Sequence, residues 1–170
     1  MLSFDIRALR EQAVSVDADL PASDPVWQEG DPVPAGDGVH VTGRLSAAGP
    51  GRFYWHARIS GEVAGLCRRC LTDATAPVQD EAHFIFADDV GDEVDDPDVY
   101  VIDPGAHELD LRPVVREQWL LAAPAFLECR KECKGLCPRC GADLNTSPCD
   151  CPPATDARWD ALRAPGEAAE

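Results

Sequence analysis

Eight cysteines constrain the folding of this chain more than any other feature of its sequence. They are Cys67, Cys70, Cys129, Cys133, Cys137, Cys140, Cys149 and Cys151. Cysteines clustered at such short spacings in a cytoplasmic chain indicate metal binding rather than a disulfide framework. We therefore expect part of the chain to fold around Zn²⁺ held by cysteine thiolates.

The strongest metal signal is CPRCG, residues 137–141. Two thiolates three positions apart fit a tight turn in which both sulfurs face one ion, and backbone N–H groups after the first cysteine can donate to its sulfur. Gly141 can adopt the positive φ that closes such a turn. The segment is typical of a zinc-ribbon knuckle, which supplies two of the four ligands that a closed structural site requires.

The other six cysteines can complete this site and form a second one. Cys149 and Cys151 follow the knuckle most closely, although their Cys-x-Cys spacing is tighter than usual. A second tetrahedral site would join the end of a hairpin to the chain after the main helix, through Cys67, Cys70, Cys129 and Cys133. Two four-cysteine sites are preferred, because four spare thiols beside a metal would bind or oxidise indiscriminately. One or two structural Zn²⁺ ions are thus the alternatives.

Hydrophobic patterning predicts an α+β fold. Residues 39–45 and 53–66 have the alternation and β-rich composition of strands, and a Gly-Pro-Gly turn between them favours a hairpin. Further strands are expected at 78–86 and 99–103. The segment DLRPVVREQWLLAA predicts a helix with Asp110 at its cap and Pro113 in its first turn. An apolar stripe with one polar interruption is expected to face the core; it consists of Leu111, Val114, Val115, Gln118, Trp119 and Ala122. The expected architecture is an antiparallel β-sheet with one main helix and a C-terminal cysteine-rich zinc module.

Composition changes along the chain suggest four segments. Residues 1–38 open with a strand-like and a short helical pattern and then become rich in Pro, Gly and Asp, so they are expected to form an irregular N-terminal arm pinned by Trp27. Residues 39–128 form the α+β core and residues 129–163 the zinc-binding module. A short helix at 156–162 would pack Trp159 back on the domain. Residues 164–170 are expected to be a disordered tail.

Charge is distributed unevenly in this acidic chain, whose formal net charge is −16. Residues 71–111 contain no Lys or Arg and many acidic residues, which favours a basic partner. Basic residues instead accompany the cysteines, and they are the candidates for RNA contact: Arg68, Arg69, Arg130, Lys131, Lys134 and Arg139. They can either compensate thiolate charge or contact phosphates, and the sequence leaves both roles open.

Several classes of function are disfavoured by what the sequence lacks. No apolar run approaches the ~20 residues of a membrane span, and the N-terminus does not resemble a signal peptide, so we expect a cytoplasmic protein without a membrane partner. The four histidines show no ligand spacing and are interpreted as sheet-face residues, which favours structural over catalytic zinc. No nucleophile–base pair or phosphate loop is visible, so neither an enzyme nor a small-molecule substrate is expected.

The same motifs resemble the YceD family, over roughly Val39 to Leu162. The resemblance is carried by CRRC, DLRPVVREQWLLAAP, CRKECKGLCPRCGADLN, CDC and DARWDAL. That family is bacterial with plastid relatives and is linked to 23S rRNA accumulation and assembly of the large ribosomal subunit. The resemblance implies that this chain binds a precursor of the large subunit through rRNA, a basic ribosomal protein or both. In that case the chain is a zinc-binding factor that bridges the two. The alternatives are a zinc-stabilised interaction module, a chaperone for a basic protein and, less favoured, a thiol redox protein.

Overall fold

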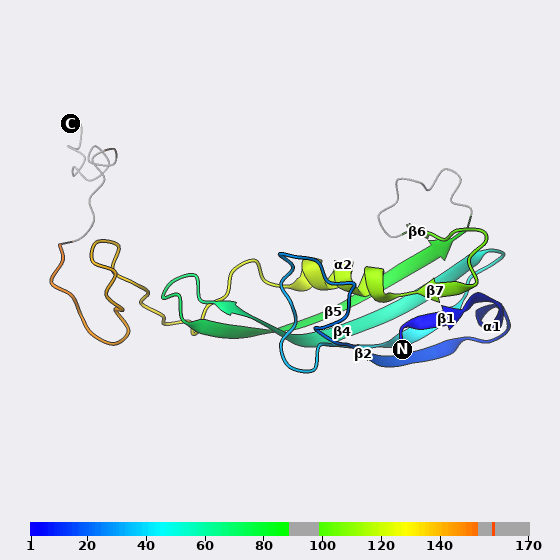
Figure 1. Ribbon diagram of the computed structural model, residues 1–170, viewed down its shortest axis with the longest axis horizontal. Helices are drawn as coiled ribbons and strands as arrows, with labels where there is room; N and C mark the ends of the chain where they lie inside the picture. Colours follow the sequence, from blue (N-terminus) through cyan, green and yellow to red (C-terminus); the bar gives the residue numbers. More distant parts are fainter. Residues whose placement is uncertain (89–98, 153–157, 159–170) are drawn as a thin grey trace, which may run out of the picture.

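The computed structural model describes residues 1–88, 99–152 and 158, and in these residues a five-stranded sheet forms the body of the molecule (Figure 1). Its strand order is β2-β3-β4-β5-β6, with β2 Val14–Leu20, β3 Val39–Ala47, β4 Arg52–Leu66, β5 Asp73–Ala87 and β6 Val99–Val101. Neighbouring strands are antiparallel except β5 and β6, which are parallel. A separate two-stranded sheet pairs β1, Ser3–Asp5, with β7, Glu108–Asp110.

Buried and more exposed side chains alternate along β3 and β4, so that one face of the large sheet is buried. In β4, Phe53, Trp55, Ala57 and Ile59 are buried, while the residues between them lie on the opposite face. The hairpin predicted around the Gly-Pro-Gly turn is present, and Gly49 and Gly51 both have positive φ there. The strand predicted at 78–86 is longer than expected, because its pairing with β4 continues from Ala87 to Asp73.

The first 38 residues are more regular than the irregular arm that the sequence suggested. After β1, Asp5 caps helix α1, Ile6–Glu11, by accepting hydrogen bonds from the backbone of Arg7 and Ala8. Strand β2 then pairs with β3 along its whole length. The alternation of apolar and polar residues in β2 is short, but it places Val16 and Leu20 in the core. Apolar burial and edge pairing together stabilise this strand, which sequence reasoning missed.

Residues 21–38 are irregular, as expected, and they pack against helix α2, Arg112–Ala122. The rings of Trp27 and Trp119 meet edge to face with centroids 6.4 Å apart. Trp119 is fully buried and donates from Nε1 to the carbonyl oxygen of Pro32, at 2.6 Å. Arg116 adds an ion pair with Asp31, at 2.7 Å. The segment is therefore fixed to the helix through indole and guanidinium contacts.

Helix α2 matches the predicted helix closely and covers the buried face of the sheet. The predicted cap is wrong by one residue: Leu111 is the N-cap and makes no side-chain capping hydrogen bond, because Asp110 ends strand β7. Asp110 still accepts from the backbone N–H of Arg112, and Pro113 occupies the first turn. The predicted apolar stripe is buried at Val114, Val115 and Trp119. None of the helices in the described part of the chain is long and apolar enough to cross a bilayer. The helix expected at 156–162, with Trp159, lies outside the described residues, apart from residue 158.

Candidate metal centre

The first cysteine cluster is formed at the end of the long β4–β5 hairpin, which extends away from α1 toward the C-terminal segment (Figure 1). Cys67 and Cys70 occupy the turn that follows β4, as predicted. The turn is closed by hydrogen bonds from Leu71 N to Cys67 O and from Cys67 N to Thr72 O. The chain after α2 returns to this turn, where Arg68 N donates to Leu127 O at 2.9 Å. This contact brings Cys129 and Cys133 to the hairpin.

Sulfur separations in this cluster fit a tetrahedral metal. Cys67 Sγ lies 3.9 Å from Cys133 Sγ, and Cys70 Sγ lies 3.6 Å from Cys129 Sγ. A tetrahedral ion with Zn–S bonds of about 2.3 Å separates its sulfurs by about 3.8 Å. A disulfide would require about 2.05 Å, and all eight cysteines are free. The four residues predicted to share a site therefore form one group that can hold a metal ion.

Hydrogen bonds around the first cluster favour thiolates at two of its positions. Backbone N–H groups of Cys129 and Cys70 lower the pKa of Cys67 to about 6. The Thr72 hydroxyl, 3.1 Å from the sulfur, lowers the pKa of Cys70. Burial raises the pKa of Cys129 to about 12 in the absence of an ion. A divalent cation would compensate this cost, because metal ligation deprotonates a thiol.

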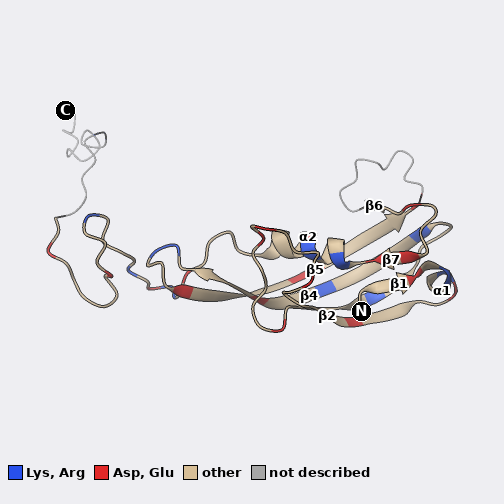
Figure 2. Ribbon diagram, in the orientation of Figure 1, with Lys and Arg blue, Asp and Glu red and all other residues tan. Residues whose placement is uncertain are grey.

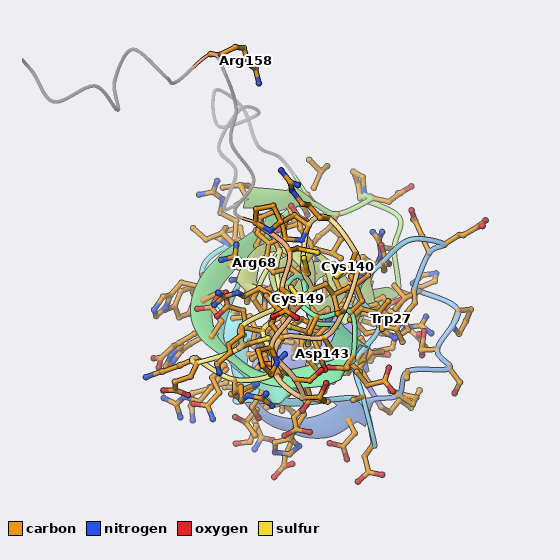
Figure 3. The ribbon with its side chains drawn as sticks, turned by 90° about the vertical axis from the view of Figure 1, so that its left-hand side faces the viewer. Trp27, Arg68, Cys140, Asp143, Cys149 and Arg158 are labelled. Carbon is orange, nitrogen blue, oxygen red and sulfur yellow. The ribbon has the colours of Figure 1, made fainter. Side chains whose placement is uncertain are left out.

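The second cluster contains Cys137, Cys140, Cys149 and Cys151, which is the second group that the sequence predicted. The CPRCG knuckle has the expected form: Gly141 has a φ of 73° and its N–H donates to Cys137 O at 2.9 Å. Backbone N–H groups of Cys140 and Arg139 lower the pKa of Cys137 to about 6. The ligand sulfurs all lie within 4.8 Å of one another, so a metal ion can be held here too. Figure 3 looks onto this end of the molecule and labels Cys140 and Cys149.

Comparison with known proteins identifies the family. Residues 55–164, more than half of the chain, match the model of the family described as large ribosomal RNA subunit accumulation protein YceD. The chain belongs to the YceD family. The matched region contains all eight cysteines, so both clusters lie within the family domain.

Curated relatives of this YceD-family chain are themselves described as uncharacterized. One is YlbN of Bacillus subtilis, 33% identical over 86 residues, which covers 50% of this chain and 49% of YlbN. Others are Rv2926c of Mycobacterium tuberculosis and Mb2951c of Mycobacterium bovis, each 31% identical over 130 residues, covering 74% of this chain and 55% of the relative. The chain thus spans about half the length of the curated relatives it matches. No solved structure matches it.

All six basic residues predicted to lie near the cysteines are exposed, and Lys and Arg are visible at the hairpin end in Figure 2. Arg68 is engaged locally: it pairs with Glu128 at 2.9 Å and lies over the ring of Phe126. That ring is 67% exposed, which is unusual for an aromatic side chain in this protein. Arg69 and Leu136 are joined through their backbones, at 2.9 Å, so the hairpin turn contacts the segment between the two clusters.

The acidic stretch is less uniform than its composition suggested. Residues 89–98, at its centre, lie outside the described residues. Of those described, Asp80 accepts from Gln118, Glu81 pairs with Arg58, and Asp110 pairs with Arg112. These three carboxylates therefore have partners within the fold rather than forming a uniform free acidic face.

Two features of the structure were not visible to sequence reasoning. Asn145, from the loop of the second cluster, directs its Nδ2 at Cys133 Sγ of the first cluster, at 3.6 Å. Its Oδ1 accepts from Lys134 N, and Asp143 orients the amide. The other feature is a group of His56, Glu81 and His83 on the sheet. The histidines are sheet-face residues, as predicted, but only strand pairing brings these three together.

Proposed function

We propose that this YceD-family chain is a zinc-stabilised, non-enzymatic factor for 23S rRNA accumulation and biogenesis of the large ribosomal subunit in the cytoplasm. The observation that carries the proposal is the family match across a domain that ends in two four-cysteine clusters bordered by exposed basic residues. In this proposal the basic residues beside the two cysteine clusters contact rRNA. The acidic stretch from Asp73 to Asp110 engages a basic ribosomal protein.

The donor sets support structural zinc. Within the described part of the chain each cluster offers four sulfurs and no carboxylate or imidazole, and four thiolates fill a tetrahedral site without leaving a position for substrate. The first cluster is also packed as a small core, with Cys67, Cys70 and Cys133 buried beside Ala74. Zinc there would stabilise the fold of the hairpin end, and the donors favour Zn²⁺ over harder ions such as Mg²⁺.

The basic residues support a local contact with RNA. A Zn²⁺ ion with four thiolates carries a charge of about −2, so cations nearby compensate it first. Their guanidinium and ammonium groups are nevertheless exposed to solvent and can reach phosphates. Exposed Phe126, with Arg68 over its ring, offers the kind of surface on which an unpaired base stacks. The formal net charge of −16 makes general binding to nucleic acid unfavourable, so RNA contact is confined to this end.

A sucrose-gradient experiment tests this function. Tagged chain from cell lysate is sedimented, and the RNA and protein composition of each fraction is measured. We expect co-migration with precursors of the large subunit. A chain that stays at the top of the gradient even at low salt would overturn stable residence on particles and favour a chaperone for a free basic protein.

Charge reversal separates RNA contact from charge compensation. Arg69→Glu with Lys131→Glu should release the chain from particles if phosphates are contacted. Arg7→Glu with Arg10→Glu is the matched control, since both residues are exposed on α1 and the change in net charge is the same. Zinc content is measured in every variant. Unchanged sedimentation of the first pair, with zinc retained, would contradict the RNA contact.

Thiol titration separates structural zinc from a redox role. Structural zinc predicts cysteines that are protected until a chelator is added and then react as the hairpin end loosens. Rapid reaction of the thiols with zinc still bound would instead favour a redox pair.

A further inference from the structure

The group of His56, Glu81 and His83 lies on the face of the large sheet that α2 leaves open. Along β4 and β5 these residues alternate with buried Trp55 and Phe84. Helix α2 contacts β5 through Asp80. Side chains alternate along a strand, so Asp80 lies on the opposite face of β5 from Glu81 and His83. The cysteine clusters are distant in the fold, because they lie beyond the far end of the β4–β5 hairpin.

Strand register makes the three side chains converge. His56 is directly opposite His83, and Glu81 is opposite Arg58, the next residue on the same face of β4. The two imidazole rings stack, with centroids 4.6 Å apart and planes 7° apart. His56 Nε2 lies 2.6 Å from Glu81 Oε1. One ligand atom from each residue lies within 4.8 Å of the other two, although the residues are up to 27 positions apart in the chain.

Neighbouring side chains support this group in the way that outer ligands support a metal site. The hydroxyl of Tyr54 contacts Nδ1 of His83, at 2.5 Å, and so orients that ring. Arg58 Nη2 donates to the second carboxylate oxygen of Glu81, at 3.0 Å. Such contacts fix the tautomer of a ligating histidine and the orientation of a ligating carboxylate. Tyr54, Arg58 and the three central residues therefore form an organised polar cluster.

We propose that His56, His83 and Glu81 form a third metal site, for a divalent transition-metal ion such as Zn²⁺, Ni²⁺ or Co²⁺. Two imidazoles and one carboxylate suit these ions, whereas Mg²⁺ and Ca²⁺ prefer an all-oxygen set. The ion would replace the hydrogen bond between His56 and Glu81, and the two stacked imidazole rings would rotate so that one nitrogen lone pair of each points at it. With three protein ligands on a solvent-exposed face, the site keeps a position for water or an incoming ligand, in contrast to the four-thiolate clusters. Its affinity would be lower than that of the four-thiolate clusters, because the side chains of His56 and Glu81 are 38% and 47% exposed to solvent.

The test is a Ni²⁺ titration of the full chain by calorimetry, after its cysteine clusters have been loaded with zinc and the zinc content measured. We expect one Ni²⁺ to bind in addition to the zinc already present, and His83→Gln or His56→Gln to weaken this binding at least ~10-fold. His40→Gln is the control, because His40 is exposed on the neighbouring strand β3 and pairs with Asp19. It should leave Ni²⁺ affinity unchanged.

Two outcomes would overturn the third site. One is a zinc-loaded chain that binds no Ni²⁺, in which case the group is a cross-strand hydrogen-bond network only. The other is Ni²⁺ binding that His56→Gln and His83→Gln leave unchanged. Amide NMR signals locate the ion independently, since paramagnetic Ni²⁺ at this site should broaden residues of β4 and β5 near 56 and 83. If the cysteine clusters do not bind zinc, the chain will have a low zinc content before the Ni²⁺ titration begins. That result is distinct from the absence of Ni²⁺ binding at the third site.

Discussion

At the scale of single residues, Asn145 connects the two cysteine clusters. Its amide donates to Cys133 of the first cluster and accepts from Lys134 N, while its backbone belongs to the loop between Cys140 and Cys149. An N–H donor stabilises a thiolate and orients it toward its metal. Asn145 thus couples the order of the second loop to the charge of the first cluster.

Replacement of Asn145 should weaken metal retention at the first cluster. Asn145→Ala removes the hydrogen bonds of this side chain with Cys133, Lys134 and Asp143. We expect zinc release to a colorimetric chelator to accelerate ~10- to 100-fold for one of the two ions. Thr146→Ala is the control, because Thr146 lies in the same loop and its hydroxyl donates to the backbone oxygen of Asp143. Equal release kinetics for Asn145→Ala and the unaltered chain would show that this amide does not support the metal.

The carboxylate of Asp31 should make the stability of the fold depend on pH. Its hydrogen bonds from Arg116 hold its pKa below the usual range of an aspartate. A carboxylate with a lowered folded-state pKa stabilises the protein above its unfolded pKa, near 4, and this contribution is lost as pH falls through the folded pKa. Asp31→Asn should therefore lower Tm at about pH 7, and the difference should shrink toward about pH 3.

Thermal denaturation at several pH values measures this effect. Asp37→Asn is a suitable control, since Asp37 is exposed in the same irregular segment. A Tm difference for Asp31→Asn that stays constant across the acidic range would contradict a role for the ionised carboxylate.

At the scale of elements, α2 holds the irregular N-terminal segment and the sheet together. Trp119 is in contact with Trp27 and donates to Pro32 O, and its ring approaches Gly61 of β4, where a Cβ would lie 3.2 Å from it. One indole therefore joins three parts of the chain. Gly61 leaves room for that ring, which explains a glycine in the middle of a long strand.

Truncation of the Trp119 side chain should strongly lower the stability of the fold. Trp119→Ala leaves a large cavity in the core and should lower the free energy of unfolding by about 3–5 kcal/mol, as measured by urea denaturation. Leu121→Ala, in the same helix but 74% exposed, should change it by less than about 0.5 kcal/mol. Similar values for the two variants would contradict the central place of Trp119 in the core.

At the scale of the whole molecule, the structure places the two cysteine clusters in series beyond one end of the sheet (Figure 1). The first is built from the β4–β5 turn and the chain after α2, so it belongs to the hairpin. The second is attached by residues 134–136 and by Leu144 N donating to Gly135 O. Loss of the second cluster should accordingly leave the sheet intact, and it should affect the first cluster only through the contact of Asn145 with Cys133.

Paired substitutions test this separability. Cys140→Ser with Cys149→Ser should reduce zinc from two ions to one per chain and leave the main unfolding transition unchanged. Cys67→Ser with Cys133→Ser should also remove an ion, and it should lower Tm because both residues are buried in the hairpin's own core. Zinc analysis and differential scanning calorimetry measure both effects. Loss of both ions from the first variant would show that the clusters form one cooperative unit.

The sequence by itself determined the features that depend on neighbours in the chain. The period of two in residues 39–45, the apolar stripe that includes Trp119 and the CPRCG knuckle are local patterns, and the strands, the helix and the grouping of the cysteines followed from them. Strand β2 was missed because its seven residues lie next to a long irregular segment and offer only a short alternation. Its position was decided by pairing with β3.

Tertiary structure alone decided which distant side chains meet. The approach of Asn145 to Cys133 depends on the path of the loop between Cys140 and Cys149, which no local pattern specifies. The convergence of His56, Glu81 and His83 depends on the register of β4 and β5, since a shift of one residue would send one strand's side chains to the other face. Register is set by burial and backbone pairing over the whole hairpin, and so these contacts become visible only when the chain is folded.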